Sequence, residues 1–465
     1  MEDFQLVQEY TRKRITPEQA AGLVQSGMSI FLGIGANMAS IIDKHLAARK
    51  NELKDVSVQS SLDTVEHEFL KADPHAEVFK WNSGFFLHSV RRQLAERGSG
   101  IYWAQSWHLA PGVIREQNTK DIAFIVTAPM DVHGNFNFGL SVTELMAFCE
   151  VSKKVVVIVR EDMPVVCGGQ EEAIHISKVD HIVEDREYKT FCLPPVPAKE
   201  EDRRIAKNIV SAGLIRDGAT LQIGIGGLPN SMLEALVDAG VRHLGIHSEM
   251  LTDKMFDLIQ SGVVDNTCKK IDRYKSTFAF CLGSRRLYDF IDHNPMFASY
   301  PVDYVNNPLV IAQQPRMFSL NTTMQVDLVG QVDSEQIGGD RPRQISGTGG
   351  QLDFVMGTML SQDRQGISVL ALYSQYKGRS RIVPVLQKGT VVTVPRSLVD
   401  YIATEWGVVK SRGLSISDRA QALIRIAHPD HRDMLMRQAV DAGFISYRAG
   451  QSDQLPKGVI KVHDE

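Results

Sequence analysis

A repeated segment constrains the fold of this chain more than any other feature. The sequence AGLVQSGMSIFLGIG at 21–35 aligns without a gap with AGLIRDGATLQIGIG at 212–226. Glycines recur at matching positions, as Gly22/Gly213, Gly27/Gly218, Gly33/Gly224 and Gly35/Gly226. Each copy has the pattern of a helix end, a glycine turn, a short apolar strand and a G-I-G loop. The repeat therefore predicts two α/β halves of similar fold.

The rest of the chain fits strands that alternate with helices. Near-continuous apolar runs, typical of parallel strands covered on both faces, occur at 122–130, 153–160, 367–374 and 389–395. Helices are expected at 232–240, 253–261, 396–405 and 417–427. A chain of 465 residues is longer than a single hydrophobic core usually accommodates. We expect two open α/β domains with mainly parallel sheets.

A proline-rich and then charged segment, FCLPPVPAKEEDRR at 191–204, predicts the domain boundary because it directly precedes the second repeat. The predicted division is an N-terminal half at 1–195, a C-terminal half at 196–446 and a polar tail at 447–465.

Composition excludes several classes of function. A net charge of −4 provides no general attraction to nucleic acid or to an anionic membrane. None of the five cysteines stands in a C-x-x-C pair, which disfavours a zinc site and a disulfide framework and fits a reducing compartment. The first residues lack the apolar core of a secretory signal, and the longest aliphatic run, VVVIV at 155–159, is too short to span a bilayer. A cytoplasmic location is expected.

Glu249 occupies an unusual position for a carboxylate. The second strand of each half is expected at 55–62 and at 243–250, where Glu249 falls opposite Ser61, so only one copy carries the acid. The carboxyl ends of strands are where open α/β sheets bind ligands, and a following helix N-terminus favours the ionised form. Glu249 is therefore either a functional group, at one site per chain between the halves, or only a partner of the helix dipole.

Two glycine-rich loops could approach a ligand. GIGGLPN at 224–230 follows a strand and opens a helix, and SGTGGQLDF at 346–354 exposes further backbone amides. A dinucleotide fingerprint would need glycine where Pro229 stands, which disfavours a nicotinamide oxidoreductase. Motifs of P-loops, serine hydrolases (G-x-S-x-G) and zinc proteases (H-E-x-x-H) do not occur. The alternatives are a tight structural turn for the first loop and a flexible linker for the second.

Several motifs occur in order and carry a resemblance to a known family. They are GIGGLPN, GIHSEM, GSRRLYDFI, PVDYVNNP, SLNTTMQVDLVGQV, SGTGGQLDF, KGRSRIVP and TEWG, between 224 and 407, with APMDVHGNFNFG at 128–139. Together they resemble the class I coenzyme A transferases, within the group of 4-hydroxybutyrate and butyryl-CoA transferases and acetyl-CoA hydrolases. The resemblance covers most of the chain.

The resemblance implies a ping-pong reaction. The glutamate that aligns with Glu249 attacks an acyl-CoA thioester, and the released thiolate opens the resulting anhydride to leave a glutamyl-CoA thioester. A second carboxylate then reverses these steps. Acyl-CoA and small carboxylates are the implied partners, and no metal or permanently bound cofactor is implied. The family also suggests a homodimer or a higher even homo-oligomer.

The resemblance also implies roles for residues around Glu249. The amide N–H groups of Gly350 and Ile225 and the side chain of Asn306 would face the oxyanion. The residues expected to bind CoA are Gly226, Gly227, Leu228, Pro229, Asn230, Gly349, Lys377 and Glu405. Departures from the family pattern at Ser248, Trp406 and 372–376 leave the mechanism in place and the acyl group open.

Acyl specificity is expected from the N-terminal half. Met38, Phe85 and Phe86 are candidate walls for a short aliphatic acyl group, and Arg91 or Arg92 could pair with a dicarboxylate; ordinary core positions are the alternative for all of them. Three functions remain open from the sequence: a CoA-transferase, a thioesterase on the same scaffold, and a non-catalytic CoA-binding protein.

Overall fold

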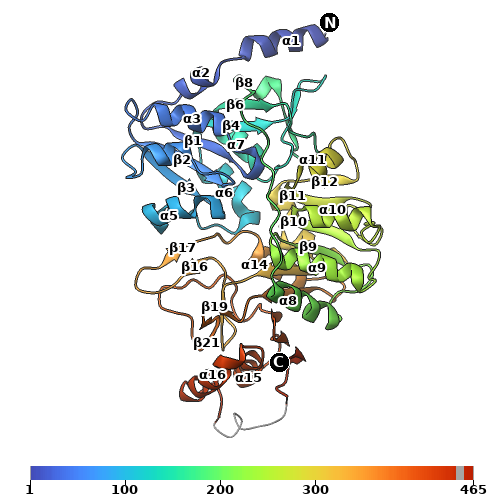
Figure 1. Ribbon diagram of the computed structural model, residues 1–465. Coiled ribbons are helices and arrows are strands. Elements are labelled where there is room, and N and C mark those ends of the chain that lie inside the picture. Colours follow the sequence, from blue (N-terminus) through green and yellow to red (C-terminus); the bar gives the residue numbers. More distant parts are fainter. Residues whose placement is uncertain (1, 447–454, 464–465) are drawn as a thin grey trace.

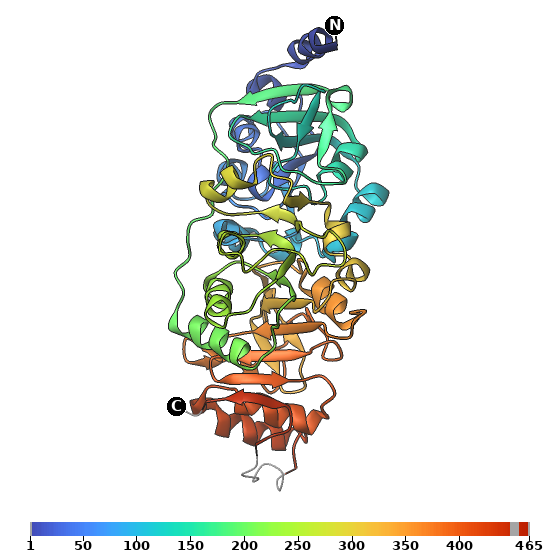
Figure 2. The same ribbon diagram turned by 90° about the vertical axis from the view of Figure 1, so that its right-hand side faces the viewer.

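The computed structural model describes residues 2–446 and 455–463. Figures 1 and 2 show an elongated molecule. The N-terminal half, the C-terminal half and the last two α-helices follow one another along its long axis.

The N-terminal half contains one parallel sheet. Its strand order is β3-β2-β1-β4-β6-β8, and every neighbouring pair is parallel. The strands are β1 (Ser29–Ile34), β2 (Val56–Ser61), β3 (Phe79–Ser83), β4 (Lys120–Thr127), β6 (Ser152–Arg160) and β8 (His181–Asp185). The helices of this half are α1 (Glu2–Lys13), α2 (Pro17–Gly22), α3 (Ser40–Ala48), α4 (Glu68–Ala72), α5 (Arg91–Arg97), α6 (Ala110–Gln117) and α7 (Leu145–Val151).

The C-terminal half contains a longer sheet. Its order is β12-β11-β10-β9-β13-β18-β22-β23-β24, parallel from β12 to β22 and antiparallel beyond. The strands are β9 (Thr220–Ile223), β10 (Gly245–Leu251), β11 (Ser276–Cys281), β12 (Phe297–Ser299), β13 (Phe318–Thr322), β18 (Ile367–Ala371), β22 (Tyr401–Thr404), β23 (Gly407–Lys410) and β24 (Val459–Val462).

Helices surround this second sheet. They are α8 (Glu200–Ser211), α9 (Gly227–Asp238), α10 (Asp253–Gln260), α11 (Arg285–Ile291), α12 (Val302–Val305), α13 (Pro308–Ile311), α14 (Gln351–Met359), α15 (Ile416–Arg425) and α16 (Pro429–Asp441). Shorter ribbons pair β14 (Gln325–Asp327) with β15 (Val332–Asp333) and β21 (Ile382–Val383), β16 (Gln336–Ile337) with β17 (Arg343–Gln344), β19 (Gln375–Tyr376) with β20 (Arg379–Ser380), and β5 (Asn135–Asn137) with β7 (Ala173–His175).

The two sheets repeat one strand order, which confirms the predicted fold class. The series β3-β2-β1-β4-β6-β8 corresponds to β11-β10-β9-β13-β18-β22. The matched glycines explain why the sequence repeats. Gly27 and Gly218 adopt φ of +81° and +74° in the turns before β1 and β9, a conformation that side chains with a Cβ disfavour. Gly35 and Gly226 also have positive φ, of +58° and +121°, in the loops that follow these strands.

The connection between the halves runs from β8 to α8, along the side of the molecule in Figure 2. The predicted boundary at 195/196 falls within this connection. The polar tail predicted from residue 447 needs a correction, because Val459–Val462 forms β24 and pairs with β23 at the edge of the second sheet. Its residues 447–454 and 464–465 lie outside the described part of the chain.

Two predictions in the C-terminal half were wrong. The predicted helix at 396–405 contains the strand β22, whose residues are buried because β18 and β23 flank it. Burial on both sides overrides the helical appearance of this short apolar run. The predicted strand at 389–395 is a loop with one isolated bridge, between Val332 and Val394.

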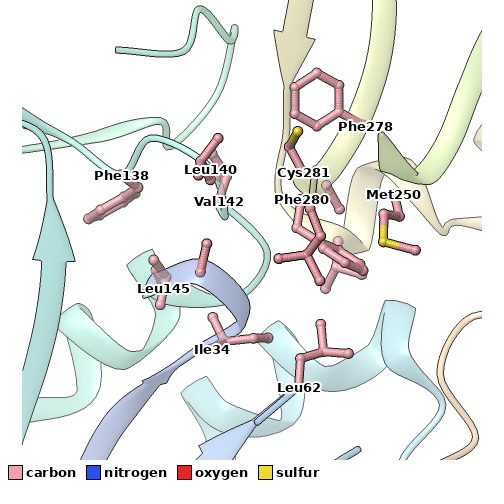
Figure 3. Close-up of a cluster of buried hydrophobic side chains, with 14 of the residues drawn as sticks. Ile34, Leu62, Phe138, Leu140, Val142, Leu145, Met250, Phe278, Phe280 and Cys281 are labelled. Atoms are coloured by element: carbon pink, nitrogen blue, oxygen red, sulfur yellow. The ribbon is translucent and has the colours of Figure 1, made fainter. Parts of the chain in front are cut away.

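An apolar interface joins the halves. Figure 3 shows Ile34, Leu62 and Leu140 from the first half packing toward Met250 and Phe280 from the second. Backbone bonds cross the interface as well: Cys281 N–H donates to Leu140 O at 2.7 Å, and Val142 N–H donates to Ala279 O at 3.1 Å. These side chains belong to one continuous buried cluster, so the halves share one core, and full burial of each contributes about 1.5–3 kcal/mol.

Candidate active site

The carboxyl ends of the two sheets face each other across a cavity of about 200 Å³. The N-terminal half contributes Leu62 after β2, and Phe85 and Leu87 after β3. The other residues that line the cavity belong to the C-terminal half: Gly224, Ile225, Pro229, Glu249, Met250, Phe280, Leu282, Leu320, Asn321, Thr322, Ser334, Ser346, Gly347, Thr348, Gly349, Gly350 and Gln351.

Glu249 is the carboxylate of this cavity. It lies near the end of β10 and is half-buried. The side-chain amide of Asn306, the residue that ends α12, donates to Glu249 Oε2 at 2.6 Å. The backbone N–H of Gly350 is a second donor to the same carboxylate. Hydrogen-bond donors, rather than a cation, therefore hold Glu249 among the described residues.

Burial raises the pKa of Glu249 to about 8. The hydrogen bonds from Asn306 and Gly350 oppose this rise, whereas the nearby carboxyl groups of Asp353 and Glu144 reinforce it. The sequence predicted that the helix after β10 would favour the ionised form. Removal of water from the carboxylate outweighs that effect here.

A neutral histidine fixes the position of Asn306. His247 lies two residues before Glu249 on β10, and burial lowers its pKa to about 4. Its Nε2–H donates to Val305 O at 2.8 Å, and the side chain of Gln314 donates to its Nδ1 at 3.2 Å. Because Val305 directly precedes Asn306, these bonds tie the amide donor to the strand that carries Glu249.

Gly350 approaches Glu249 too closely for any side chain. A Cβ at this position would overlap Glu249 Oε2 and Asn306 Nδ2. Neighbouring Gly349 has φ of +52°, and a Cβ there would lie 3.0 Å from the Phe85 ring. Glycine is required in this loop because the loop backbone, the Glu249 carboxylate and the Phe85 ring from the other half meet there.

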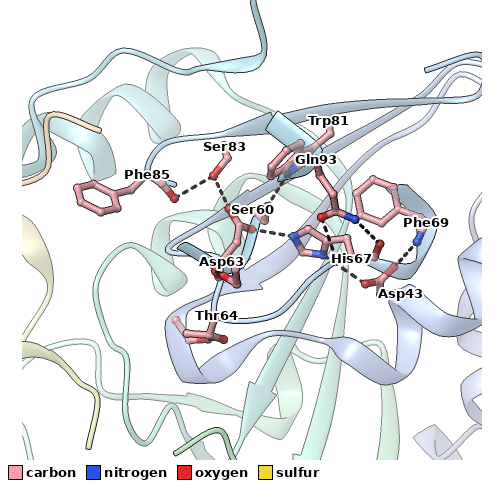
Figure 4. Close-up of polar contacts among 12 residues, drawn as sticks. Asp43, Ser60, Asp63, Thr64, His67, Phe69, Trp81, Ser83, Phe85 and Gln93 are labelled. Carbon is pink, nitrogen blue, oxygen red and sulfur yellow. Dashed lines mark hydrogen bonds and ion pairs between the residues drawn. The ribbon is translucent and has the colours of Figure 1, made fainter. Parts of the chain in front are cut away.

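A buried ionic cluster supports the segment that carries Phe85 (Figure 4). His67 Nδ1 lies 3.2 Å from Asp43 Oδ2, and its Nε2 lies 2.8 Å from Asp63 Oδ1. Burial alone would lower the pKa of His67, but the bonds to the two aspartates raise it to about 10. Ser83 Oγ donates to Asp63 Oδ2 at 2.7 Å and also contacts Phe85 O at 3.3 Å. The cluster thereby positions the wall of the cavity.

The structure brings together only part of the predicted CoA loop. Ile225, Pro229 and Gly349 line the cavity with Gly350. Gly226, Gly227, Leu228 and Asn230 belong to the same loop and the start of α9 but are not among the lining residues.

Lys377 and Glu405 lie in another cavity, of about 350 Å³. Lys377 is exposed in the turn between β19 and β20, whereas Glu405 is buried and accepts from Ser374 N–H at 3.0 Å. The lining residues of this cavity and those of the Glu249 cavity do not overlap.

Of the predicted acyl walls, Phe85 lines the Glu249 cavity, and the other two occupy core positions. Phe86 is fully buried between Trp81 and Tyr102, and Met38 is also buried. Neither predicted arginine reaches the cavity. Arg91 Nε donates to Ile345 O at 3.2 Å, and Arg92 pairs with Glu66 at 3.2 Å.

Glu144 was missed by the sequence prediction. It directly precedes α7, is 3% exposed, and its Oε2 accepts from the indole N–H of Trp107 at 3.1 Å. An acid within the apolar sequence SVTELMAF was the available signal. The sequence analysis did not single it out, and a helix start, where the structure places it, is an ordinary position for an acid.

Comparison with known proteins assigns the family. The model for the acetyl-CoA hydrolase/transferase N-terminal domain matches residues 2–194, and the model for the C-terminal domain of the same family matches residues 283–439. The chain belongs to the acetyl-CoA hydrolase/transferase family.

Curated relatives are similar over nearly the full chain. A succinyl-CoA:cyclohexane-1-carboxylate CoA transferase of Geobacter metallireducens is 39% identical over 93% of this chain and 96% of its own length. A butyryl-CoA:acetate CoA-transferase of Anaerostipes caccae is 38% identical over 94% and 97%, respectively. The crystal structure of RipA from Yersinia pestis has a TM-score of 0.83 and 34% identity, covering 95% of this chain and 100% of RipA.

Two features are absent from the described residues. No helix in 2–446 is long and apolar enough to cross a membrane. Within the described ranges, no cluster of three or more His, Cys, Asp or Glu side chains is arranged to bind a metal ion.

Proposed function

We propose that this protein transfers CoA from an acyl-CoA to a short carboxylic acid through a covalent intermediate on Glu249. The main support is the environment of Glu249: a half-buried carboxylate in a small cavity, held by two neutral donors. A carboxylate that is partly removed from water and held in one orientation is a competent acyl acceptor. The family and the CoA transferases among the relatives support the same reaction class.

The first half-reaction moves CoA to the protein. The Glu249 carboxylate attacks the thioester carbonyl, and the C–S bond breaks. The CoA thiolate departs, and the acyl group is now bound to Glu249 as an acyl-glutamyl anhydride. The thiolate then attacks the glutamyl carbonyl, releases the acyl group as a carboxylate and forms a glutamyl-CoA thioester. The second half-reaction repeats these steps in reverse with the acceptor acid. These steps need no proton, electron or group from a cofactor. We therefore propose no permanently bound cofactor.

The donors to Glu249 would also serve the reaction. Each attack creates a tetrahedral oxyanion, and one preorganised donor to such an oxyanion is typically worth about 10²–10³ in rate. Asn306 Nδ2 and Gly350 N–H both donate to the Glu249 carboxylate, so they would face the oxyanion that forms when the thiolate attacks the glutamyl carbonyl. Ile225 borders the same cavity and is the candidate for a third donor.

Intact-protein mass spectrometry tests the intermediate. The protein is mixed with acetyl-, butyryl- or succinyl-CoA without an acceptor acid, beside Glu249→Gln, which keeps the side-chain shape but cannot attack. Glu234→Gln on the exposed face of α9 is the matched control. We expect a mass gain of CoA less one water in the wild type and the control, and none in Glu249→Gln.

Other outcomes separate the alternatives. Rapid release of free thiol without an acceptor would identify a hydrolase instead. Neither adduct nor thiol from any donor, with CoA still bound in a titration, would identify a binding protein. The two relatives are named for different donors, butyryl-CoA and succinyl-CoA, so the donor has to be measured. We also propose an even homo-oligomer, which light scattering on the purified protein would test.

A further inference from the structure

A second, much smaller cavity lies behind the wall of the Glu249 cavity. Its volume is about 20 Å³. Phe85, Gln105, Trp107, Glu144 and Gly349 are among the residues that line it. Phe85 and Gly349 line both cavities, and a Cβ on Gly349 would lie 4.0 Å from Glu249 Oε1. The small cavity is therefore next to the reacting carboxylate, on the side of the N-terminal half.

The positions of the two cavities indicate the direction in which a bound acyl chain would extend from Glu249. The loop at 224–230 lies on the C-terminal side of Glu249, whereas Leu62, Phe85 and Leu87 lie on the N-terminal side. If the proposed function holds, CoA approaches along the first side and the acyl chain extends toward the second. A cavity of about 20 Å³ accommodates one group of the size of a water molecule. It would therefore hold only the end of a short acyl chain.

The charge of the lining residues determines which acyl groups this pocket can accept. No described residue lining either cavity is Lys, Arg or His, and the titratable groups among them are the carboxyls of Glu249 and Glu144. A second carboxylate on the substrate would lose its water without gaining a cation, and it would lie beside two acids. The nearest predicted cations, Arg91 and Arg92, are bound elsewhere.

We propose that Glu144 determines acyl specificity: it closes the pocket with a carboxyl group, admits short neutral acyl chains with at most one small polar end group, and rejects dicarboxylates. This inference rests on the proposed function. The indole N–H of Trp107 holds Glu144 Oε2 at 3.1 Å and orients the group. Burial raises the pKa of Glu144 to about 7, so a large fraction is a neutral acid near neutral pH. A neutral acid can donate to a hydroxyl or a water.

Donor selectivity tests this assignment. The ratio of kcat/KM is measured for butyryl-CoA, 4-hydroxybutyryl-CoA and succinyl-CoA with acetate as acceptor. We expect the wild type to prefer the two neutral donors over succinyl-CoA by at least about a hundredfold. At pH 8, above the Glu144 pKa of about 7, Glu144→Gln removes a negative charge and supplies an N–H donor, so it should reduce this preference at least about tenfold.

Two further variants keep the test decisive. Gln105→Lys places a cation on the lining and should also favour succinyl-CoA. Glu150→Gln, on the exposed side of α7 where Glu150 pairs with Arg115, makes the same chemical change outside the pocket and should leave the preference unchanged. Thermal melting verifies the fold of each variant.

Contrary results have distinct meanings. Equal use of succinyl-CoA by the wild type, or an unchanged preference in both Glu144→Gln and Gln105→Lys, would overturn the role of Glu144. Equal loss with every donor in Glu144→Gln would show a purely structural role and also overturn it. Absence of transfer from any donor by the wild type would instead refute the proposed function itself.

Discussion

Replacement of Gly350 by alanine tests the geometry around Glu249. The backbone at Gly350 has φ −97° and ψ 8°, which alanine can adopt, so the substitution adds no backbone strain. The new Cβ would instead overlap Glu249 Oε2 and Asn306 Nδ2. The carboxylate can turn aside into the cavity of about 200 Å³, so we expect the protein to remain folded.

The cost should fall on catalysis. Turning aside would break the 2.6 Å bond from Asn306 and the bond from Gly350 N–H. Loss of one such donor costs about 2.7–4 kcal/mol in the transition state, so kcat/KM for CoA transfer should fall by at least about 10². Steady-state transfer and the yield of the glutamyl-CoA adduct measure this loss.

Gly112→Ala is the matched control, because a Cβ there meets open space within α6. It should leave activity unchanged and stabilise the protein by about 0.4–1 kcal/mol. The geometry would be refuted if Gly350→Ala, folded and with an unchanged melting temperature, kept kcat/KM within about threefold of the wild type, since the donor loss expected above is far larger.

Three other predictions follow from the pKa values and contacts. The kcat/KM for acyl-CoA should rise with pH, reach half of its maximum near pH 8 and level off above it, because the proposed nucleophile is the carboxylate form of Glu249 and burial raises its pKa to about 8; a flat profile from pH 6 to 9 would contradict this. Asn306→Ala removes a bond that favours the charged form, so it should lower kcat about 10²–10³-fold and shift that inflection upward, as the pH profile of the variant would show. The His67 pKa is raised to about 10 from 6.5, so its stabilisation is complete below pH 6.5 and is lost as pH rises through 10; chemical denaturation should show this decline in the wild type and not in His67→Gln.

Prediction of the fold from the sequence succeeded where local pattern and final environment agree. The runs at 122–130 and 153–160 became β4 and β6, central strands with residues buried on both faces. The predicted secondary structure was wrong at 389–405. The segments there are short, and whether they form a strand, a helix or a loop depends on neighbours distant in the sequence. β22 is a strand because β18 and β23 pair with it, and nothing within 396–405 encodes those partners.

The candidate site divides in the same way. The repeat and the strand pattern singled out Glu249, and the motifs singled out Asn306 and Gly350. They did not indicate that burial would raise the pKa of Glu249, since that depends on the wall that the N-terminal half provides. Phe85 was predicted as a wall alongside Met38 and Phe86, and only packing distinguished the lining residue from the two core residues.

The sequence by itself determined the duplicated α/β architecture. It also determined that Glu249, which has no counterpart in the first copy, stands at the end of a strand and before a helix. It could do so because strand periodicity and glycine turns are local properties, set by backbone sterics and by which face of an element is buried. The tertiary structure alone decided which groups meet Glu249 and how far from water it lies. It also brought Glu144 close to Glu249 from the other half. Such contacts form only when the carboxyl ends of two separate sheets pack against each other. No local sequence pattern predicts which residues meet there.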